Sequence, residues 1–317
     1  MKVCYLIQTH TNPRQIYRLV QTIKQSSPNA LILISHDCRH CPLDRAPLKY
    51  LSEVYLLQDK RPRKRGEFSL IQPYFEAIEW AFRHNLNFDW VSYLSGQDYP
   101  TQSLAKFNKL LASTTYDGFM QYFDVFSSDS LWDAEEAIKR YYCQYYRPPE
   151  WTSDFLLKIS RIQDFLPIIL SSYFGSPIMG VRSKSTPFNK NFICYGGSQW
   201  HTLSRKCVAY LRDFVRNNHR IVNYYKGTYL SDESFMQTAL INSGLFKICN
   251  DNHRYVDFIG TEAGHARVLN HNDYQLLASE EFYFARKFNP DSRILDMLDT
   301  RISQQDSMSQ PEPVFQI

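Results

Sequence analysis

The first third of the chain alternates short apolar runs with amphipathic stretches. The run Val3 to Ile7 leads into a polar cluster, Gln8 to Pro13, and Ala30 to Ile34 is a second run with the length of a buried strand. Between the two runs, apolar side chains recur at helical spacing: Ile16, Leu19, Val20 and Ile23. The pattern predicts a β-α-β unit in which the first strand leads through a loop into a helix.

The same alternation continues to about residue 123. We expect helices at Phe68 to Phe82 and Leu104 to Leu111, and strands at Trp90 to Leu94 and Gly118 to Phe123. The first of these helices has one apolar face, made of Ile71, Phe75, Ile78 and Phe82. The strand at Trp90 ends in the polar turn Ser95 to Pro100. Ligands of open α/β sheets bind beyond the carboxyl ends of strands, so this turn and Gln8 are candidates for ligand contact.

The second half of the chain has a less regular pattern. Its apolar spacing predicts three helices: Asp154 to Leu170, Ser204 to Val215 with Ser204 as its N-cap, and Asp232 to Ile241. The segments Asn272 to Ala278 and Ser292 to Leu298 close the ordered part of the chain. The tail from Ser303 is rich in Ser, Gln and Pro, and this composition predicts disorder. There is no internal repeat.

Composition narrows the class of protein. Of the 317 residues, 44% are hydrophobic and 21% are charged, which is typical of a globular protein. The formal net charge of +4 is too small to favour nucleic-acid binding by itself. We find neither a signal sequence nor a run of roughly 20 apolar residues. We therefore expect a soluble cytoplasmic protein, for which peripheral contact with a membrane stays open.

The seven cysteines have no regular spacing. Cys38 and Cys41 form a C-x-x-C pair near His36 and His40, but no second pair stands at the distance of a zinc site. A metal site on these residues is an alternative. Reduced thiols are the favoured interpretation, since an odd, irregular set of cysteines is typical of a cytosolic protein.

Five basic residues surround a proline in the segment Lys60 to Arg65. A solvated loop is the favoured interpretation of such a run. Contact with an anionic acceptor, with substrate phosphates or with a membrane surface is the alternative. Nucleic acid is a weaker one, because nothing shaped like a groove reader accompanies the run.

Two further segments are candidates for ligand contact. Arg140 to Trp151 is the densest aromatic segment, and we expect half of it in the core and the rest on a loop. Aromatic rings on such a loop, Tyr145 and Trp151 among them, can hold a sugar. The glycine pair before Ser198 and Trp200 predicts a close approach of backbone to a ligand.

Two adjacent acids, Asp232 and Glu233, stand at the start of an apolar helical segment. Ser231 or Asp232 can cap the free amides of that helix, so Glu233 is one acid more than capping requires. No Asp-x-Asp motif ends a strand, although this is the usual Mg²⁺ or Mn²⁺ anchor for a nucleotide diphosphate. A diphosphate substrate would therefore be neutralised by Arg and Lys side chains.

Together these segments resemble glycosyltransferase family 14, which comprises the core-2/I-branching β-1,6-N-acetylglucosaminyltransferases and the peptide O-xylosyltransferases. Five segments occur in the family's order: Ile34 to Asp37, Leu94 to Pro100, Gly197 to Trp200, Asp232 to Phe235, and Phe284 to Phe288. The resemblance covers about Lys2 to Asp299. The form of the Asp-Glu-Ser-Phe segment is closer to the xylosyltransferase and bacterial branch.

The resemblance implies an α/β fold of the GT-A type, with a Rossmann-like nucleotide-sugar-binding domain, a mainly parallel central sheet and an appended α+β acceptor region. One domain would span residues 1–302, with a donor-binding half to about 125 and an acceptor half after it, followed by a disordered tail at 303–317. The implied reaction is inverting and independent of metal. It moves a sugar, GlcNAc being favoured, from a UDP-sugar to a hydroxyl of a glycan or glycolipid.

The resemblance also assigns roles to residues. The general base falls on Glu233. The diphosphate-binding residues fall on Lys287 and Arg267, with Arg286 as the alternative to Arg267. Further donor contacts are expected from residues at the strand ends: Gln8, Asp37, Ser95, Gly96 and Asp98. Candidate acceptor contacts are Tyr145, Trp151, Trp200 and Asp232.

The chain departs from the family at Arg65-Gly66-Glu67, where Trp-Gly-Gly is usual. The nucleoside contact and the donor sugar stay open for this reason, and UDP-xylose is an alternative donor. The family's acceptor residues and the paired disulfides of its secretory members have no counterparts here. A non-catalytic carbohydrate- or nucleotide-binding module is a further alternative, but the presence of both Glu233 and Lys287 favours an enzyme.

Overall fold

A computed structural model describes residues 1–146, 168–173, 176–261, 265–279 and 281–309. Within these residues the centre is a seven-stranded, mainly parallel sheet. Its strands are, in spatial order, β13 (Ile248–Cys249), β6 (Gly118–Met120), β12 (His201–Ser204), β4 (Trp90–Ser95), β1 (Val3–Thr9), β2 (Leu31–Asp37) and β3 (Val54–Asp59). β12 runs antiparallel to both of its neighbours.

The central strands are buried on both faces, which explains their nearly continuous apolar sequences. In β1, for example, Leu6 enters one core and Ile7 enters the core on the opposite face. β1 pairs in parallel with β2 and β4, and the register places Gln8 beside Ser35 and Ser95. The carboxyl ends of these strands therefore lie along one edge of the sheet.

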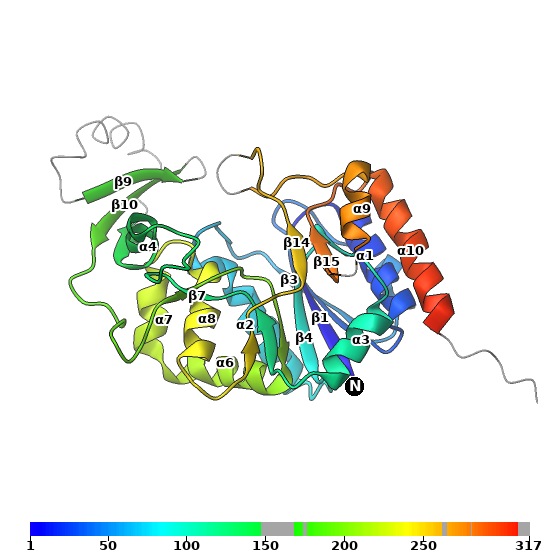
Figure 1. Ribbon diagram of the computed structural model, residues 1–317, viewed down its shortest axis with the longest axis horizontal. Coiled ribbons are helices and arrows are strands. Elements are labelled where there is room, and N and C mark those ends of the chain that lie inside the picture. Colours follow the sequence, from blue (N-terminus) through cyan, green and yellow to red (C-terminus); the bar gives the residue numbers. More distant parts are fainter. Residues whose placement is uncertain (147–167, 174–175, 262–264, 280, 310–317) are drawn as a thin grey trace, which may run out of the picture.

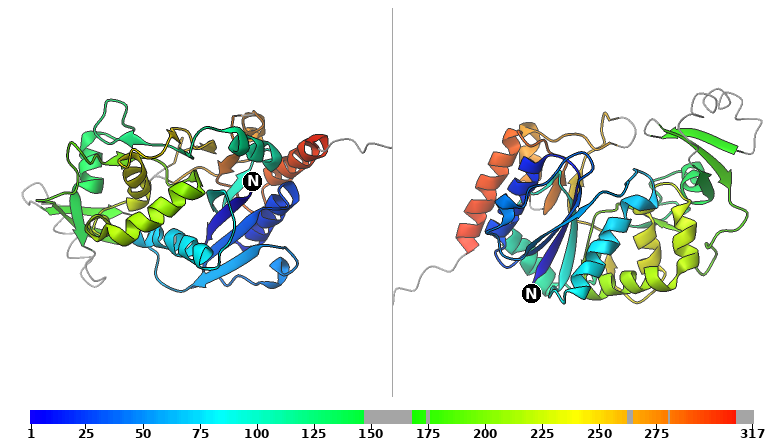
Figure 2. Two further views of the ribbon diagram at one scale, coloured as in Figure 1. Left: turned by 90° about the horizontal axis from the view of Figure 1, so that it is seen from below. Right: turned by 180° about the vertical axis from the view of Figure 1, so that it is seen from behind.

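Helices cover both faces of the sheet (Figures 1 and 2). One face packs against α1 (Pro13–Ser26), α3 (Leu104–Ser113) and α10 (Arg293–Ser309). The other packs against α2 (Gln72–Arg83), α6 (Arg205–Asn217), α7 (His219–Lys226) and α8 (Phe235–Ile241). No helix in the described ranges combines the length and the apolar character needed to cross a membrane.

Three small sheets flank the central one. They are β14 (Arg254–Val256), β15 (Phe284–Arg286) and β5 (Asp98–Pro100); β8 (Cys143–Tyr146), β10 (Ser176–Arg182) and β9 (Ile168–Tyr173); and β11 (Tyr195–Gly196) with β7 (Phe123–Asp124). The first matters most for the site, because its register sets Arg286 opposite Asp98. The short helical elements are η1 (Ala46–Leu48), η2 (Phe68–Leu70), α4 (Ala134–Tyr141), η5 (Ser231–Glu233), η6 (His271–Asp273) and α9 (Tyr274–Leu277).

The predicted β-α-β unit is confirmed by β1, α1 and β2. Three predicted elements differ in extent. The helix expected at Phe68 to Phe82 is η2 followed by α2, and the strand expected at Gly118 to Phe123 is divided between β6 and β7. The helix expected at Asp232 to Ile241 breaks at Ser234, where φ is −146°. The ordered segment Asn272 to Ala278 is η6 followed by α9.

The ends of two other predicted elements are wrong. α10 continues to Ser309, so Ser303 to Ser309 is helical rather than disordered. Tertiary contacts support this helical end, because Ser103, the N-cap of α3, donates its amide to Gln305 and its hydroxyl to Asp306. The helix predicted at Asp154 to Leu170 lies outside the described residues up to 167, and its last residues belong to strand β9.

Ser204 stands at the predicted N-cap of α6, but its side chain accepts no capping hydrogen bond. Its hydroxyl instead donates to Cys207 Sγ at 3.4 Å. The prediction of the position is therefore right, and the prediction of the capping bond is wrong.

α10 is held to the first half of the chain by one carboxylate. Asp299 accepts hydrogen bonds from the Tyr99 hydroxyl at 2.6 Å, from the Thr22 hydroxyl at 3.0 Å and from Arg18 Nη2 at 2.6 Å. The three donors come from α1 and β5, so Asp299 joins segments far apart in the sequence. If the carboxylate is removed, the Tyr99 and Thr22 hydroxyls lose this acceptor, whereas Arg18 keeps Asp296.

We expect Asp299→Ala to lower the free energy of unfolding by about 2–3 kcal/mol, because the buried hydroxyls of Tyr99 and Thr22 lose their charged acceptor. Asp296→Ala is the matched control. Asp296 pairs with the same Arg18 but is 71% exposed, and such a pair contributes less than about 1 kcal/mol. Urea unfolding of both variants measures the difference; equal losses would show that the Asp299 network does not hold α10.

Candidate active site

The turn after β4 is fixed by its own side chains. Asp98 accepts the Ser95 amide at 2.9 Å and the Ser95 hydroxyl at 2.6 Å. The Gly96 amide donates to the Gln8 carbonyl at 3.1 Å, which ties the turn to the end of β1. A Cβ at Gly96 would lie 3.0 Å from the Thr9 methyl group, so the backbone here approaches β1 closely.

Tyr93 interacts with several of the predicted site residues. Its hydroxyl donates to Gln8 Oε1, and Gln8 Nε2 donates to the Leu70 carbonyl at 2.9 Å. The amide of Gln8 therefore makes hydrogen bonds within the protein and fixes Tyr93. Burial raises the pKa of the Tyr93 phenol, and the charged groups that act on it are Asp232, Arg63, Asp98 and Arg286. These residues come from four separate segments.

The two acids lie on a tight turn. Leu230, just before it, adopts the left-handed conformation with φ 51°, which costs a non-glycine residue roughly 1–2 kcal/mol. The turn is held by backbone hydrogen bonds from the Glu233 amide to Leu230 at 3.0 Å, and from the Gly197 amide to the Glu233 carbonyl at 2.8 Å. The close approach predicted for the glycine pair is therefore made to the acidic turn of the protein itself.

Arg65 and Gly66 border the same turn. The Leu230 amide donates to the Gly66 carbonyl at 2.9 Å. Gly66 has φ +80°, and a Cβ there would lie 2.3 Å from the ring of Tyr229. Only glycine fits this conformation and this contact. The departure at Arg65-Gly66-Glu67 thus lies directly against the acidic turn.

Arg140 holds the Glu233 carboxylate. Its Nη1 donates to Glu233 Oε2 at 2.5 Å, while Glu136 binds the other side of the same guanidinium. The guanidinium also lies 4.1 Å above the ring of Trp132. Glu233 stays 34% exposed, so it is positioned but still reachable from solvent. Within the aromatic segment, the sequence pattern had not singled out this arginine.

The two acids differ in their environment. Asp232 is only 5% exposed, and its Oδ1 has no hydrogen-bond partner among the described residues. Burial and then the charge of Glu233 raise the pKa of Asp232 to about 7. Burial also raises the pKa of Glu233, but Arg140 opposes that shift. Glu233 therefore has a charged partner that favours its ionised form, whereas the charge of Glu233 favours the protonated form of Asp232.

A cluster of cations faces the acidic turn. The Arg286 guanidinium lies 4.5 Å above the Trp200 ring and 3.3 Å from Asp98 Oδ1. Arg65 Nη1 donates to the ring of His265 at 2.9 Å. Burial and the charges of Arg286 and Arg65 lower the pKa of Lys287. Lys287 has no carboxylate partner within the described ranges, which leaves its charge available to an anionic ligand.

Arg267 is neutralised by the protein. Its guanidinium pairs with Asp257 at 2.6 Å and with Asp273 at 2.7 Å. Its carbonyl accepts from the Lys287 amide at 3.4 Å, so it shapes the backbone beside Lys287. Two other arginines interact electrostatically with the acidic turn or with Tyr93. The charge of Arg65 lowers the pKa of Glu233, and the charge of Arg286 lowers the pKa of Tyr93.

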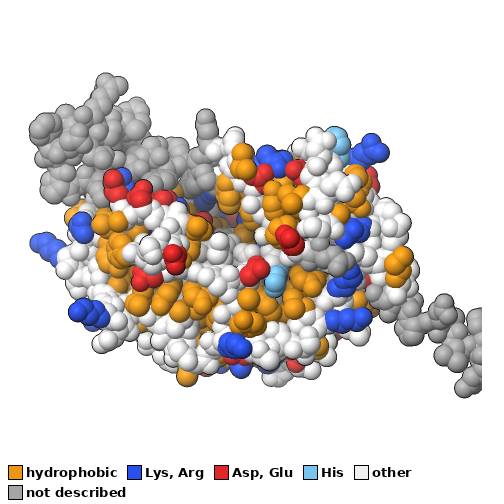
Figure 3. Space-filling view, in the orientation of Figure 1, with side chains coloured by type: hydrophobic (Ala, Val, Ile, Leu, Met, Phe, Trp, Pro, Cys, Tyr) orange, Lys and Arg blue, Asp and Glu red, His pale blue; other side chains and the backbone are white. Residues whose placement is uncertain are grey.

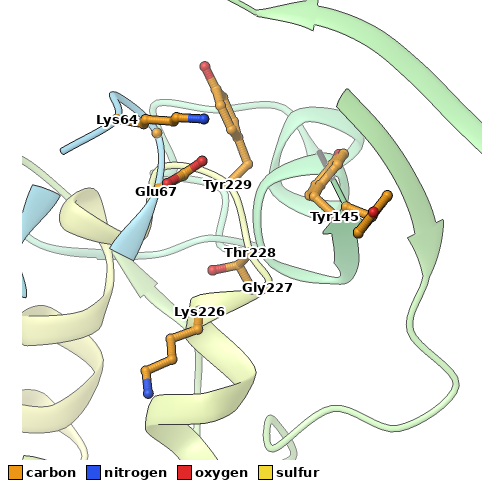
Figure 4. A pocket seen from close by; sticks show the side chains of 9 residues that line it. Lys64, Glu67, Tyr145, Lys226, Gly227, Thr228 and Tyr229 are labelled. Atoms are coloured by element: carbon orange, nitrogen blue, oxygen red, sulfur yellow. The ribbon is translucent and has the colours of Figure 1, made fainter. Parts of the chain in front are cut away.

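The predicted acceptor residues are in different environments. Trp200 is 5% exposed and lies between Tyr93 and Arg286, so it offers no open ring face. Tyr145 lines a cleft of about 260 Å³ (Figure 4), and its hydroxyl donates to the Lys139 carbonyl at 2.6 Å. Trp151 lies outside the described residues. Of the aromatic segment, Tyr141 is buried and Tyr146 is 60% exposed, as the interpretation of half core and half surface expects.

The cleft borders the acidic turn. Lys64 and Glu67 lie on one side of it, Tyr145 on the other, and Tyr229 between them (Figure 4). Tyr229 directly precedes Leu230, whose carbonyl accepts the Glu233 amide. The space-filling view is hollowed between the part with α4 and the part with α9 (Figure 3).

The residues near the C-x-x-C pair are engaged in hydrogen bonds. Both ring nitrogens of the buried His36 are used, one with the Thr9 hydroxyl at 2.8 Å and one with the Cys41 carbonyl at 2.6 Å. Nearby, Asp37 binds Arg39 at 2.7 Å, and the pKa of Asp37 is lowered by this pair. Among the described residues, no three His, Cys, Asp or Glu side chains gather as a candidate metal site.

The basic run is more ordered than the solvated-loop interpretation expects. Arg61 pairs with Asp59 and Glu76 at the surface. Arg63 and Arg65 turn toward the protein, whereas Lys60 and Lys64 are exposed. No spacing rule singles out these arginines, because a run of like charges does not indicate which side chains turn inward.

A sheet of this type, with an acidic turn and a cationic cluster at the ends of its parallel strands, is the framework of a nucleotide-sugar-dependent glycosyltransferase. Residues 3–282 match the Core-2/I-Branching enzyme family, and the chain belongs to that family. The predicted family is thereby confirmed, and the seven-stranded, mainly parallel sheet confirms the predicted α/β fold. Members of this family typically work without a metal ion.

A plant enzyme and several solved structures are similar to the chain. Beta-glucuronosyltransferase GlcAT14B of Arabidopsis thaliana is 30% identical over 114 residues, which are 35% of this chain and 26% of the plant enzyme. The match thus spans about a quarter of that relative. Among solved structures, the galactosyltransferase LgtC covers 99% of this chain and 98% of its own, with 8% identity and a TM-score of 0.39. TarS of S. aureus, solved with UDP-GlcNAc, covers 57% and 45%, with 11% identity and a TM-score of 0.28.

The raised pKa of Asp232 predicts that the free energy of unfolding depends on pH. Because the folded pKa of about 7 lies above the ordinary value of 3.8, the native state binds the proton more tightly than the unfolded state. The contribution of Asp232 is therefore fully favourable below pH 4 and is lost as the pH rises to about 7, by about 1.4 kcal/mol for each pH unit.

Asp232→Asn removes this titration. We expect the variant to gain unfolding free energy relative to the wild type between pH 4 and pH 7, as measured by urea unfolding across that range. Asp129→Asn, at an exposed position, should run parallel to the wild type. A parallel profile for Asp232→Asn would show that Asp232 is ionised throughout.

Proposed function

We propose that the chain is an inverting, metal-independent glycosyltransferase that moves a sugar from a UDP-sugar to a hydroxyl of a glycan or glycolipid. The observation that carries the proposal is the placement of Glu233. Its carboxylate is partly exposed, is held by Arg140 at 2.5 Å, and faces a cationic cluster at the ends of the parallel strands. In this arrangement one base serves the acceptor and several cations serve the leaving group.

Glu233 acts as the general base. It accepts the proton of the acceptor hydroxyl while that oxygen attacks the anomeric carbon, and the bond from that carbon to the UDP oxygen breaks on the opposite face. A positioned base of this kind contributes roughly 10²–10⁴ in rate. Arg140 fixes the carboxylate and favours its ionised form, and the neighbouring Asp232 holds a proton near neutral pH.

Lys287, Arg286 and Arg65 stabilise the negative charge that grows on the departing diphosphate. Fixed cations in a partly dry site need little reorganisation during the reaction, which makes this the larger contribution to the rate. Arg267 positions the backbone beside Lys287. Its guanidinium is fixed by ion pairs with Asp257 and Asp273, and its carbonyl accepts the Lys287 amide. This modifies the assignment that the sequence suggested for Arg267.

The donor half, to about residue 125, provides the strand ends with Asp37, Ser95, Gly96 and Asp98. The acceptor half provides the acidic turn and the cleft lined by Tyr145 and Tyr229, whose rings suit a sugar face. All seven cysteines are free, and we place the enzyme in the reducing cytoplasm, in peripheral contact with a membrane when the acceptor is a glycolipid.

GlcNAc is the favoured donor sugar and xylose the first alternative. A third donor follows from Arg65, which adds a cation where the family usually has Trp. A carboxylate-bearing sugar suits this extra charge, and the plant relative is a glucuronosyltransferase. The panel of donors therefore includes UDP-GlcNAc, UDP-xylose and UDP-glucuronic acid, each assayed with and without EDTA.

Glu233→Gln should abolish transfer, with a loss of at least about a hundredfold in kcat, and leave UDP binding within about twofold of the wild type. Glutamine keeps the size of the side chain but cannot accept the proton. UDP release with a donor and an acceptor mixture measures the first effect, and calorimetric titration with UDP measures the second. Loss of UDP affinity together with activity would contradict the role of general base.

Lys287→Ala should weaken UDP binding and lower kcat together, each by about tenfold or more, because one cation serves both the ground state and the leaving group. Lys109→Ala is the matched control at an exposed position on α3 and should change neither. Titration with UDP and the release assay are made on both variants. Unchanged values for Lys287→Ala would assign that lysine a structural role only.

A further inference from the structure

The Arg140 guanidinium has an acceptor for each of its three nitrogens. Nε donates to Glu136 Oε1 at 2.9 Å, and Nη2 donates to the same oxygen. Nη1 donates to Glu233 Oε2 at 2.5 Å. The side chain of Arg140 is only 13% exposed. One largely buried cation therefore serves two carboxylates, one from α4 and one from the acidic turn.

An aromatic ring fixes the plane of this guanidinium. The ring of Trp132 lies 4.1 Å below Arg140 and packs against the backbone of Gly196, where a Cβ would lie 2.2 Å from the ring. The next residue, Gly197, donates its amide to the Glu233 carbonyl at 2.8 Å. Both the carboxylate and the backbone of Glu233 are thus held by groups that surround Trp132.

Helix stability explains only part of this arrangement. Glu136 and Arg140 are four positions apart on α4, and such pairs occur on helix surfaces without any further role. Glu135 and Lys139 form such a pair on the same helix, with side chains that are 76% and 41% exposed. The pair of Arg140 differs, because its guanidinium is buried and its third nitrogen reaches Glu233.

A general base has to meet two opposing demands. It must be ionised before the reaction, and it must still be basic enough to accept a proton. A nearby cation favours the ionised form of a carboxyl group, and a nearby anion favours the protonated form. The charge of Arg140 lowers the pKa of Glu233, whereas the charge of Glu136 raises it. Glu136 therefore offsets part of the effect that the guanidinium has on the base.

We propose that Glu136 is a positioning residue that acts through Arg140 on Glu233 and so sets the pH range in which this base is active. The proposal rests on the proposed function, in which Glu233 accepts the proton of the acceptor hydroxyl. Glu136 directs Nη1 of the guanidinium toward Glu233 Oε2 and limits the charge that the guanidinium offers. Because Oε2 accepts from Arg140, Oε1 is the oxygen that takes the proton.

Other charged or titratable groups also act on Glu233. They are Asp232 beside it, Arg65 of the basic run and Tyr141 of α4. Arg65 and Tyr141 are common to all the variants below. Asp232 is coupled to Glu233, and two coupled acids titrate as a pair. Asp232→Asn is therefore the background for the titration, because one acid of the turn is then left.

The first test is a carbon-13 NMR titration of the Glu233 carboxyl group in the full chain, assigned by its absence from Glu233→Gln. Arg140→Met should decrease the ionisation constant about tenfold or more, because a cation is lost. Glu136→Gln should increase it about threefold, because an anion is lost. Glu135→Gln, at the neighbouring exposed position, is the matched control and should leave it unchanged.

The second test is the dependence of kcat on pH, with UDP release from the donor of the panel that the wild type uses. Activity is lost as the pH falls through the pKa of Glu233. At acid pH, Glu136→Gln should therefore retain more of its maximal rate than the wild type, and Arg140→Met should retain less. The maximal rate of Glu136→Gln should fall about twofold to tenfold, because the base is weaker and less firmly held.

A conservative variant separates the charge from the geometry. Arg140→Lys keeps the positive charge but lacks the fork that binds two carboxylates at once. It should keep the acid limb of the pH profile close to that of the wild type and lower the maximal rate. A variant that only damaged the fold would not restore the limb in this way. Urea unfolding of each variant checks the fold.

Two results would overturn the proposal. They are a Glu233 titration that Glu136→Gln leaves unchanged, and shifts of the same sign in Glu136→Gln and Arg140→Met. Either would make Glu136 a helix-stabilising residue only. Failure of the proposed function has a different outcome. The two opposite shifts would then appear in the NMR titration, while the wild type released UDP from none of the donors.

The test does not depend on the more disruptive change. Glu136 is 37% exposed, so Glu136→Gln leaves the core of the protein untouched and by itself gives the sign of the shift.

Discussion

The parallel register of β4, β1, β2 and β3 is the constraint on which the site depends. In a parallel sheet all carboxyl ends lie on one edge, and burial on both faces fixes the register, since a slip of one residue would turn every side chain to the wrong core. Gln8, Asp37 and Asp98 are brought to that edge by this geometry alone. The remaining parts of the site, the acidic turn and the cationic cluster, are placed against this edge by loops from the second half.

Electrostatics within the site is arranged by pairing some charges and leaving others free. Arg140 pairs with Glu233 and opposes the rise that burial causes in its pKa. Burial and the charge of Glu233 raise the pKa of Asp232, whose Oδ1 has no hydrogen-bond partner among the described residues, to about 7. On the opposite side Asp98 and Trp200 fix Arg286, and Lys287 has no carboxylate partner within the described residues. Unpaired groups such as these destabilise the unliganded fold, and they are the groups with which a charged substrate can interact.

Much of the fold followed from the sequence, because strands and amphipathic helices leave periodic apolar patterns. The β-α-β opening and the family motifs were found in this way. The breaks at Ser234 and between β6 and β7 were not, since they arise where backbone groups bind distant segments, as the Gly197 amide binds the Glu233 carbonyl. The extension of α10 to Ser309 has the same origin, because Gln305 and Asp306 in its polar end accept hydrogen bonds from Ser103, the N-cap of α3.

The sequence by itself determined the fold class, the family and the segments that make up the site, since each depends on local order along the chain. The tertiary structure decided which charges are available. Arg267 is neutralised by Asp257 and Asp273, Arg140 pairs with Glu233, and Arg63 Nε and Nη1 are buried with no hydrogen-bond partner among the described residues. These facts depend on contacts between residues far apart in the chain, and the free energy of a charge depends on burial and on its neighbours in space.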